Sequence, residues 1–265
     1  MNGGSTPDDL LKRLNTNVPH SARIWNYLLG GKDNYQADRE AGNMISEVFP
    51  GMVTMTRQSR EMLVRAVRYL AGEAGIRQFL DIGTGLPTAN NTHEIAQQAA
   101  RDSRIVYVDN DPMVLIHARA LLASTPEGAC DYIDADVRDP EAILREAART
   151  LDFTRPTALM LMGILGLVAD HDRARSIVST LMAALPSGSY LALYDGADTD
   201  PEYVEAIGRF NSGSGAVPYT PRSPEQIGRY FDGLELLSPG VVSVSHWRAS
   251  PESGAPEVSC FGGVA

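Results

Sequence analysis

The residues best suited to chemistry lie in the segment Phe79–Thr88, Phe-Leu-Asp-Ile-Gly-Thr-Gly-Leu-Pro-Thr. Gly83 and Gly85 allow a sharp turn and a close approach of the backbone to a ligand, with Thr84 between them. A Gly-X-Gly pattern alone also fits a dinucleotide site. Asp81 argues against that ligand, because a carboxylate repels a pyrophosphate but suits a cationic amino group.

Two further residues of this segment also argue against a dinucleotide ligand. Pro87 has no N–H to offer a phosphate. Thr88 stands where a dinucleotide site prefers Gly or Ala for close packing. The segment therefore favours a nucleoside that bears an amino acid over NAD.

Two more acids follow the next strands that we expect. Asp109, 24 residues after Gly85, can accept both hydroxyls of a ribose. Asp136 can accept from an adenine amino group while the N–H of Val137 donates to the ring. Each acid alone is more often a turn residue, but three acids at consecutive strand ends predict a nucleoside site.

The elements that must position these acids alternate between strands and helices. Such alternation predicts an α/β fold, a mostly parallel sheet with helices on both faces and ligands beyond the carboxyl ends of the strands. The predicted strands are Arg77–Ile82, Arg104–Val108, Cys130–Ala135, Ala158–Met162 and Ser189–Tyr194. The predicted helices are Thr92–Ala100, Pro112–Leu122, Pro140–Arg149 and Arg173–Leu185.

The two ends of the chain depart from this alternation. We expect a frayed first dozen residues and helices from Ser21 to about Gly72, broken at Gly30-Gly31. Near the other end, Pro201–Phe210 and Ser223–Phe231 predict helices. Leu234–Leu237, Val241–Val244 and Val258–Phe261 predict an antiparallel hairpin at one sheet edge. The division expected is an N-terminal helical extension, 1–73, and a core, 74–265, with a helical insertion near 198–232.

Composition excludes several classes of protein. The 265 residues carry a formal net charge of −10, which disfavours a surface built for nucleic acid. The two cysteines, Cys130 and Cys260, make neither a disulfide framework nor a zinc site, and no other metal-ligand spacing appears. The longest apolar run, Ala158–Ala169, is too short to cross a membrane. Together with the polar N-terminus, these features predict a cytoplasmic protein.

The combined motifs resemble those of class I S-adenosylmethionine-dependent methyltransferases. From Pro19 onward the chain is similar to an actinobacterial family of these enzymes long catalogued as a domain of unknown function. The resemblance lies in Ala22–Tyr35, Arg77–Thr88 and Tyr107–Pro112. It implies a Rossmann-like fold with a seven-stranded sheet and S-adenosyl-L-methionine as cofactor, and it supplies no acceptor.

The resemblance also implies roles for individual residues. Asp81, Gly83 and Gly85 should face the methionine part of the cofactor. Asp109 and Asn110 should contact the ribose, and Asp136 and Val137 the adenine. Met162 and Gly163 should lie beside the transferring methyl group.

One departure from the family bears on catalysis. Gly163–Val168 replaces the histidine expected after the fourth strand, so no catalytic base is identified. His20, His93 and His171 are the histidines nearest to candidate loops, and a lone histidine is more often structural. The preferred function is methyl transfer to a small-molecule acceptor. The alternatives are cofactor binding without catalysis and an NAD-dependent oxidoreductase.

The N-terminal helices are a candidate lid. Tyr27, Asn34 and Tyr35 flank the glycine break, and aromatic faces suit a sulfonium, so we expect Tyr27 and Asn34 at the cofactor. The alternative is that these side chains only pack the extension onto the sheet. Arg57 and Arg60 are candidates to contact the cofactor carboxylate or an acidic substrate, against the alternative of a solvated helix face.

Overall fold

The computed structural model describes residues 7–88, 90–121 and 124–265. Its centre is a seven-stranded sheet in the order β3-β2-β1-β4-β5-β7-β6. β1 to β5 are parallel, and β7 runs antiparallel to both β5 and β6. The strands are β1 (Gln78–Ile82), β2 (Arg104–Asp109), β3 (Ala129–Asp134), β4 (Ala158–Met162), β5 (Tyr190–Gly196), β6 (Val242–Ser243) and β7 (Cys260–Val264).

This is the class I methyltransferase fold predicted from the sequence. The helices of the alternating part are α5 (Thr92–Ala99), α6 (Pro112–Leu121), α7 (Pro140–Ala147) and α8 (His171–Ala183). The others are α1 (Pro7–Arg13), α2 (Ser21–Leu28), α3 (Gln36–Val48), α4 (Met52–Arg68), α9 (Pro201–Gly213) and α10 (Pro224–Gly228), with short π or 3-10 turns at Tyr69–Glu73, Leu165–Leu167, Arg229–Phe231 and Pro251–Ser253.

Two apolar layers enclose the sheet, because successive side chains of a strand point to opposite faces. In β1, Phe79 joins the core that contains α4 and α5, whereas Leu80 joins the core that contains α7 and α8. All five residues of β1 and of β4 are buried. Both central strands are therefore fixed from both sides, and so are the loops that follow their carboxyl ends.

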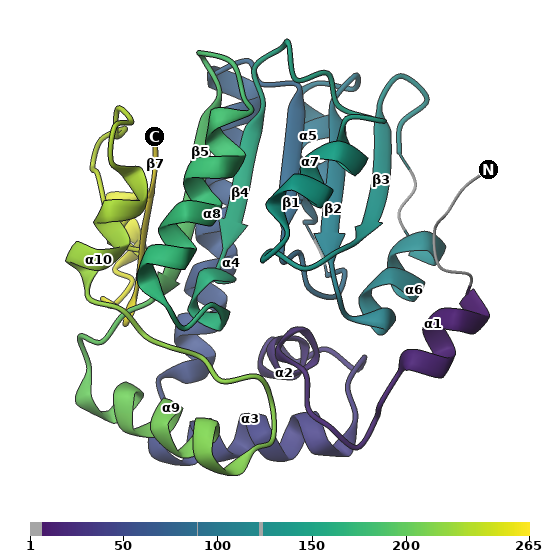
Figure 1. Ribbon diagram of the computed structural model, residues 1–265. Helices are drawn as coiled ribbons and strands as arrows, with labels where there is room; N and C mark the ends of the chain where they lie inside the picture. Colours follow the sequence, from purple (N-terminus) through teal and green to yellow (C-terminus); the bar gives the residue numbers. More distant parts are fainter. Residues whose placement is uncertain (1–6, 89, 122–123) are drawn as a thin grey trace.

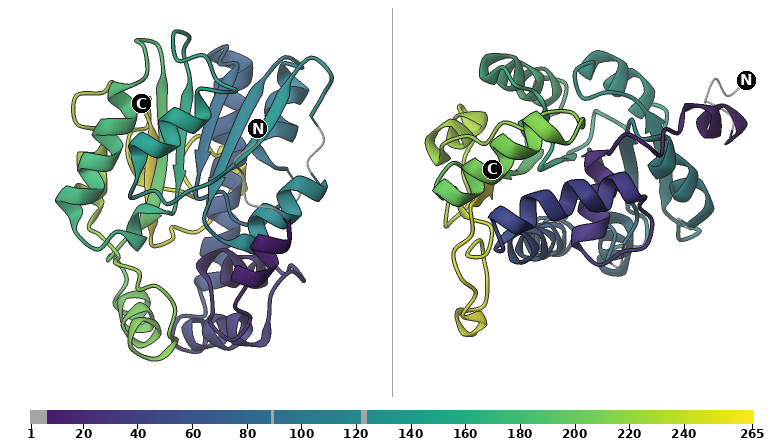
Figure 2. Two further views of the ribbon diagram at one scale, coloured as in Figure 1. Left: turned by 45° about the vertical axis from the view of Figure 1, so that its right-hand side comes forward. Right: turned by 90° about the horizontal axis from the view of Figure 1, so that it is seen from below.

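α2, α3 and α9 lie across the carboxyl edge of the sheet, whereas α4 runs along one face of the sheet (Figure 1). α3 packs against both α2 and α9, although about 150 residues separate α3 from α9 in the chain. The view from below shows these helices crossing the strand ends (Figure 2). Residues of α2, α3, α4 and α9 share one core with the sheet. This layer closes the edge at which ligands bind in such folds.

The expectation for the first dozen residues is wrong where the structure describes them. Residues 7–13 form α1, which packs against α6, and Arg13 forms an ion pair with Asp134 at the end of β3. The tertiary contact with α6 stabilises a helix that is too short to persist alone. Residues 1–6 lie outside the described part, as does Leu122, the predicted end of the helix at α6.

The predicted C-terminal strands also needed correction. Leu234–Leu237 is not a strand, and only Val242–Ser243 of the second segment pairs. The third strand starts at Cys260 and continues through Gly262 and Gly263 to Val264, beyond the predicted end. A Cβ at position 262 would lie 2.2 Å from the carbonyl oxygen of Leu193. The glycines therefore allow close strand pairing here instead of ending the strand.

Several helix ends also differ from prediction. Ser223–Phe231 is α10 followed by a 3-10 turn, and the helix expected to end at Gly72 continues as a π turn to Glu73. No helix among the described residues is both long and apolar enough to cross a membrane.

Candidate functional site

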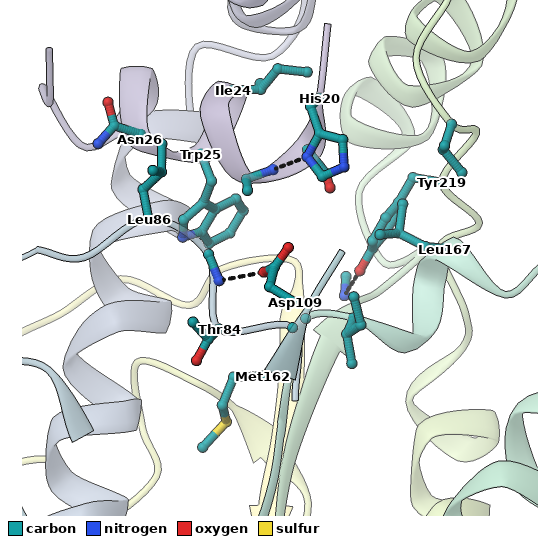
Figure 3. Close-up of a pocket in the computed structure, with 18 of the residues that line it drawn as sticks. His20, Ile24, Trp25, Asn26, Thr84, Leu86, Asp109, Met162, Leu167 and Tyr219 are labelled. Carbon is teal, nitrogen blue, oxygen red and sulfur yellow. Dashed lines mark hydrogen bonds between the residues drawn. The ribbon is translucent and has the colours of Figure 1, made fainter. Parts of the chain in front are cut away.

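A cavity of about 200 Å³ opens at the carboxyl edge of the sheet (Figure 3). It runs past the ends of β3, β2, β1, β4 and β5, which span about 19 Å at the usual strand spacing. α2, α3, α4 and α9 contribute its other walls. Ten of the twelve predicted site residues line it: Asp81, Gly83, Thr84, Gly85, Asp109, Asn110, Asp136, Val137, Met162 and Gly163.

The glycine loop has the geometry that its sequence predicts. Gly83 and Gly85 adopt φ values of +76° and +67°, which favour glycine. A Cβ at position 83 would lie 2.7 Å from Ile164, the second residue after the end of β4. The N–H of Gly83 donates to the carbonyl of Val108 at 2.8 Å, which ties the loop to β2. The turn is thus held between both neighbours of β1.

Asp81 lies at the base of this loop and is 3% exposed. Its Oδ2 accepts a 2.6 Å hydrogen bond from the hydroxyl of Thr92. Burial raises the pKa of Asp81 to about 6, although the Thr92 hydroxyl and the charge of Arg60 favour the carboxylate. A carboxylate desolvated in this way gains most from a cationic ligand group placed beside it.

Asp109 is the last residue of β2, and each of its two carboxylate oxygens accepts a hydrogen bond from a different backbone N–H. Its Oδ2 accepts from the N–H of Gly85 at 2.9 Å, and its Oδ1 accepts from the N–H of Asp111, also at 2.9 Å. Burial raises the pKa of Asp109, against the effect of these two N–H donors. Since a carboxylate has about four acceptor positions, about two remain for ligand hydroxyls.

Asp136 occupies the more open end of the cavity, beyond β3. Its Oδ1 accepts from the backbone N–H and from Nε of Arg138, each at 2.9 Å. Asn110 donates to its Oδ2 at 3.3 Å, which links the ends of β2 and β3. The N–H of Val137 makes no hydrogen bond to another described residue, so it can donate to a ligand.

The end of β4 places Met162 and Gly163 at the middle of the cavity. Gly163 has φ +82°, and its N–H donates to the carbonyl of Tyr194 at 2.8 Å. Ile164 and Leu167 follow in the cavity wall. The segment that stands in place of the expected histidine therefore contributes apolar side chains and backbone atoms, and no imidazole, to the cavity wall.

Tyr27 and Asn34, expected at the cofactor, do not line the cavity. Tyr27 packs on Gly42 of α3, where a Cβ would lie 2.8 Å from its ring, and its hydroxyl donates to Asn43. Asn34 is buried and donates to Asn26 Oδ1 at 2.9 Å. Since a helix turns 100° per residue, the opposite face of α2 is the one that meets the cavity. Its residues there include Ile24, Trp25 and Leu28, and Leu29 directly after the helix also lines the cavity.

The candidate arginines and histidines differ in whether they line the cavity. Arg60 lines the cavity and donates to the carbonyl of Asn90 at 2.8 Å, whereas Arg57 does not line it. His93 is buried behind the site and bonds to the hydroxyl of Tyr107. His171 begins α8 beside Tyr230, also outside the cavity. His20 alone of these histidines lines it.

His20 belongs to a buried ion cluster that the sequence did not indicate. Its Nδ1 lies 3.0 Å from Oδ2 of Asp111, and Nε of Arg23 lies 3.1 Å from the same oxygen. Asp38 accepts from the N–H of His20 at 2.9 Å. Burial lowers the pKa of His20, but the hydrogen bond to Asp111 and the negative charges of Asp111 and Asp109 together outweigh this effect, so the pKa is raised. The cluster fixes the start of α2 over the end of β2.

A second group that the sequence did not indicate is the aromatic wall of the cavity near β5. Tyr194, Tyr203, Phe210 and Tyr219 line the cavity, with Trp25 on the other side. Figure 3 shows Tyr219 and Leu167 facing His20 and Trp25 across it. The periodicity of Pro201–Phe210 predicted a helix, but no local signal indicated which face would meet the site. Among the described residues, no group of His, Cys, Asp or Glu could hold a metal ion.

The chain is similar to known proteins over nearly its whole length. A family model described as S-adenosyl methyltransferase matches residues 7–265. A DUF574 family protein from Streptomyces avermitilis MA-4680 is 46% identical, with a TM-score of 0.90 over 94% of this chain and 98% of that one. A proposed methyltransferase from Thermobifida fusca YX is 42% identical, with a TM-score of 0.86 over 94% of each chain. No curated protein matches the chain.

Proposed function

The chain belongs to the S-adenosyl methyltransferase family, and from that premise we propose that its cavity holds S-adenosylmethionine beside a small-molecule methyl acceptor. The observation that supports this most directly is the row of three acids, Asp136, Asp109 and Asp81, along the ends of β3, β2 and β1. S-adenosyl-L-methionine is the cofactor of the family. Its adenine, ribose and amino group match the hydrogen-bonding capacity of these acids in that order.

The acceptor positions left open on each carboxylate support this assignment. Asp109 can accept the two ribose hydroxyls on the lone pairs that Gly85 and Asp111 leave open. Asp136 can accept from the adenine amino group while the N–H of Val137 donates to a ring nitrogen. Asp81 balances the cationic amino group of the methionine part. Asn110 and Thr84 complete the contacts to the ribose and to the glycine loop.

The chain's own residues position the reactants and exclude water. When bound, the cofactor supplies a methyl group on a sulfonium, which transfers by in-line displacement to a nucleophile and leaves S-adenosylhomocysteine. Met162 and Gly163, at the centre of the cavity, hold the position of that methyl group. The buried apolar walls around them keep water from competing with the acceptor.

In this proposal the described residues of the N-terminal extension, 1–73, cover the site on the core, 74–265. Trp25, Leu28 and Leu29 replace Tyr27 and Asn34 as its contacts with the cavity. The His20–Asp111 contact holds α2 in place. The helical insertion near 198–232 supplies the facing wall through α9.

A small acceptor fits an internal cavity better than a macromolecule does, and the net charge of −10 disfavours nucleic acid. Cofactor binding without catalysis is the second candidate. It is favoured by one observation, the apolar Ile164–Leu167 turn in place of a base.

Titration calorimetry with S-adenosylmethionine and S-adenosylhomocysteine tests the proposal. We expect micromolar binding that weakens at least about tenfold, or about 1.4 kcal/mol, in Asp109→Ala. Asp172→Ala, which changes a carboxylate with a 93% exposed side chain on α8, is the control and should bind as the wild type does. Failure of folded wild-type protein to bind either ligand would refute the proposal.

A further inference from the structure

The cavity changes character between β1 and β4, where the strand order reverses. The charged residues that line it are His20, Arg60, Asp81, Asp109, Asp136 and Arg138. The acids lie at the ends of β1, β2 and β3. The guanidinium of Arg60 donates a hydrogen bond to the carbonyl oxygen of Asn90, in the loop after β1. Beyond β1, the described residues of the wall carry no charge. We call the uncharged part, formed by the ends of β4 and β5, α9 and the loop after α9, the acceptor chamber.

The walls of the acceptor chamber are apolar and aromatic. Tyr203, Ile207 and Phe210 recur on one face of α9, and each is 5% exposed or less. Tyr219 closes the chamber from the loop, and its hydroxyl is committed to Asp195 and to the N–H of Gly196. An unpaired charge buried here would cost several kcal/mol of desolvation, so an occupant must be uncharged. Aromatic walls favour an aromatic occupant through edge and stacking contacts.

The polar atoms that remain are hydroxyl groups. The hydroxyls of Tyr194 and Tyr203 make no hydrogen bond to another described residue. That of Tyr203 lies directly over the end of β5, because a Cβ at position 196 would be 2.2 Å from it. Tyr194 lies beside the proposed methyl position, since a Cβ on Gly163 would be 3.1 Å from its ring. An occupant with one polar group can therefore bond it at the methyl end of the chamber.

The described part of the acceptor chamber also contains no carboxylate or imidazole that could take a proton from the nucleophile. A general base is needed only when the nucleophile must lose a proton before or during attack. A neutral amine has a free lone pair and does not need one. An aromatic amine is weakly basic, so it enters uncharged at neutral pH.

We propose that the acceptor chamber binds an uncharged aromatic amine and that the hydroxyl of Tyr203 holds its nitrogen. In the transfer, the nitrogen lone pair forms the bond to the methyl carbon. The carbon–sulfur bond breaks and its electron pair stays on sulfur. The positive charge passes from sulfur to nitrogen, so the cavity gains no net charge, and the aromatic faces stabilise the N-methylammonium product. This product gives its proton to water as it leaves the chamber. This inference rests on the proposed function, because it needs the cofactor in the other half of the cavity.

Calorimetry on protein saturated with S-adenosylhomocysteine tests the charge requirement with three probes that share one ring system. They are 1-naphthylamine, which is uncharged, 1-naphthoate, an anion, and 1-naphthylmethylamine, a cation at neutral pH. We expect the uncharged amine to bind at least about tenfold tighter than either ion. Equal or tighter binding of an ion, or no binding of the amine, would overturn the inference.

Mass spectrometry of reactions with S-adenosylmethionine tests the nucleophile. The expected product is N-methyl-1-naphthylamine, with no comparable methylation of 1-naphthol, whose oxygen needs a base. Methylation of the naphthol at the same rate would contradict the argument.

Tyr203→Phe tests the hydroxyl without disturbing a hydrogen bond to any described residue. It should weaken binding of 1-naphthylamine at least about fivefold and leave S-adenosylhomocysteine binding unchanged, whereas unchanged amine binding would remove Tyr203 from the site. Val204→Ala, on the exposed side of α9, is the matched control and should change neither. If S-adenosylhomocysteine itself fails to bind, the proposed function fails; if only the amine fails, the acceptor inference fails alone.

Discussion

The hydroxyl of Thr92 donates a 2.6 Å hydrogen bond to Oδ2 of Asp81. Thr92 is the first residue of α5 and Asp81 lies near the end of β1, so the bond joins the two sides of the glycine loop. Both residues are buried. The bond orients a carboxylate whose pKa burial raises to about 6.

This pKa predicts that cofactor affinity depends on pH. The carboxylate form of Asp81 attracts the ligand's amino group, and the protonated form does not. Binding of S-adenosylhomocysteine should therefore weaken as the pH falls through about 6, by about tenfold between pH 7 and pH 5. Calorimetry across this range measures it. Asp81→Asn should bind weakly with little pH dependence over the same range, and a wild-type affinity that is flat would contradict the assignment.

The raised pKa of Asp195 predicts that the free energy of unfolding, rather than ligand binding, depends on pH. Asp195 is fully buried, and burial raises its pKa to about 6, against the hydrogen bond from Tyr219. Because the folded-state pKa exceeds the usual 3.8, its contribution to the free energy of unfolding is complete at low pH and is lost as the pH rises through about 6.

Asp195→Asn isolates this contribution because the amide does not titrate. Relative to wild type, the variant should gain about 2.5 kcal/mol of stability between about pH 4 and pH 7, since each unit of pKa shift corresponds to about 1.4 kcal/mol and part of the shift acts below pH 4. Urea unfolding at several pH values measures the difference. A constant difference across that range would show that Asp195 does not titrate as expected.

We expect replacement of the buried Arg222 side chain to lower the free energy of unfolding strongly. This side chain is 2% exposed and donates to the carbonyl oxygens of Leu165 and Val168, and Asp195 lies 3.7 Å away. Arg222→Met would leave these carbonyls and a buried carboxylate without their partner, at a cost of about 3–5 kcal/mol. Thermal or urea unfolding checks this. Arg229→Met, which removes an exposed ion pair with Glu225, should change stability by less than about 1 kcal/mol.

The two tryptophans provide a direct report of ligand binding. Trp25 lines the cavity, whereas Trp247 is buried away from it. Addition of S-adenosylhomocysteine should change the fluorescence of wild type and of Trp247→Phe, but not of Trp25→Phe. The Trp247 substitution is the control for unrelated changes in folding. A ligand-dependent change that persists undiminished in Trp25→Phe would show that Trp25 does not report cofactor binding.

The parallel strands β1 to β5, the glycine loop and the row of acids can be predicted from the amino-acid sequence, whereas the antiparallel strands at the edge could not be placed correctly. Each of the predicted features depends on local chemistry: glycine permits positive φ at Gly83 and Gly85, and buried apolar runs make the central strands. Parallel strands then bring their carboxyl ends to one edge for a topological reason, which is why the sequence suffices to assign Asp81, Asp109 and Asp136 to one cavity.

The side chains that complete that cavity depend instead on the packing of the elements. Trp25 rather than Tyr27 faces it, because the rotation of α2 is set by packing against α3 and α4 and not by the helical period. The pair of His20 with Asp111 and the approach of Tyr203 to Gly196 also join distant parts of the chain. Contacts of this kind depend on how rigid elements pack, and a single sequence contains no local pattern from which that packing can be derived.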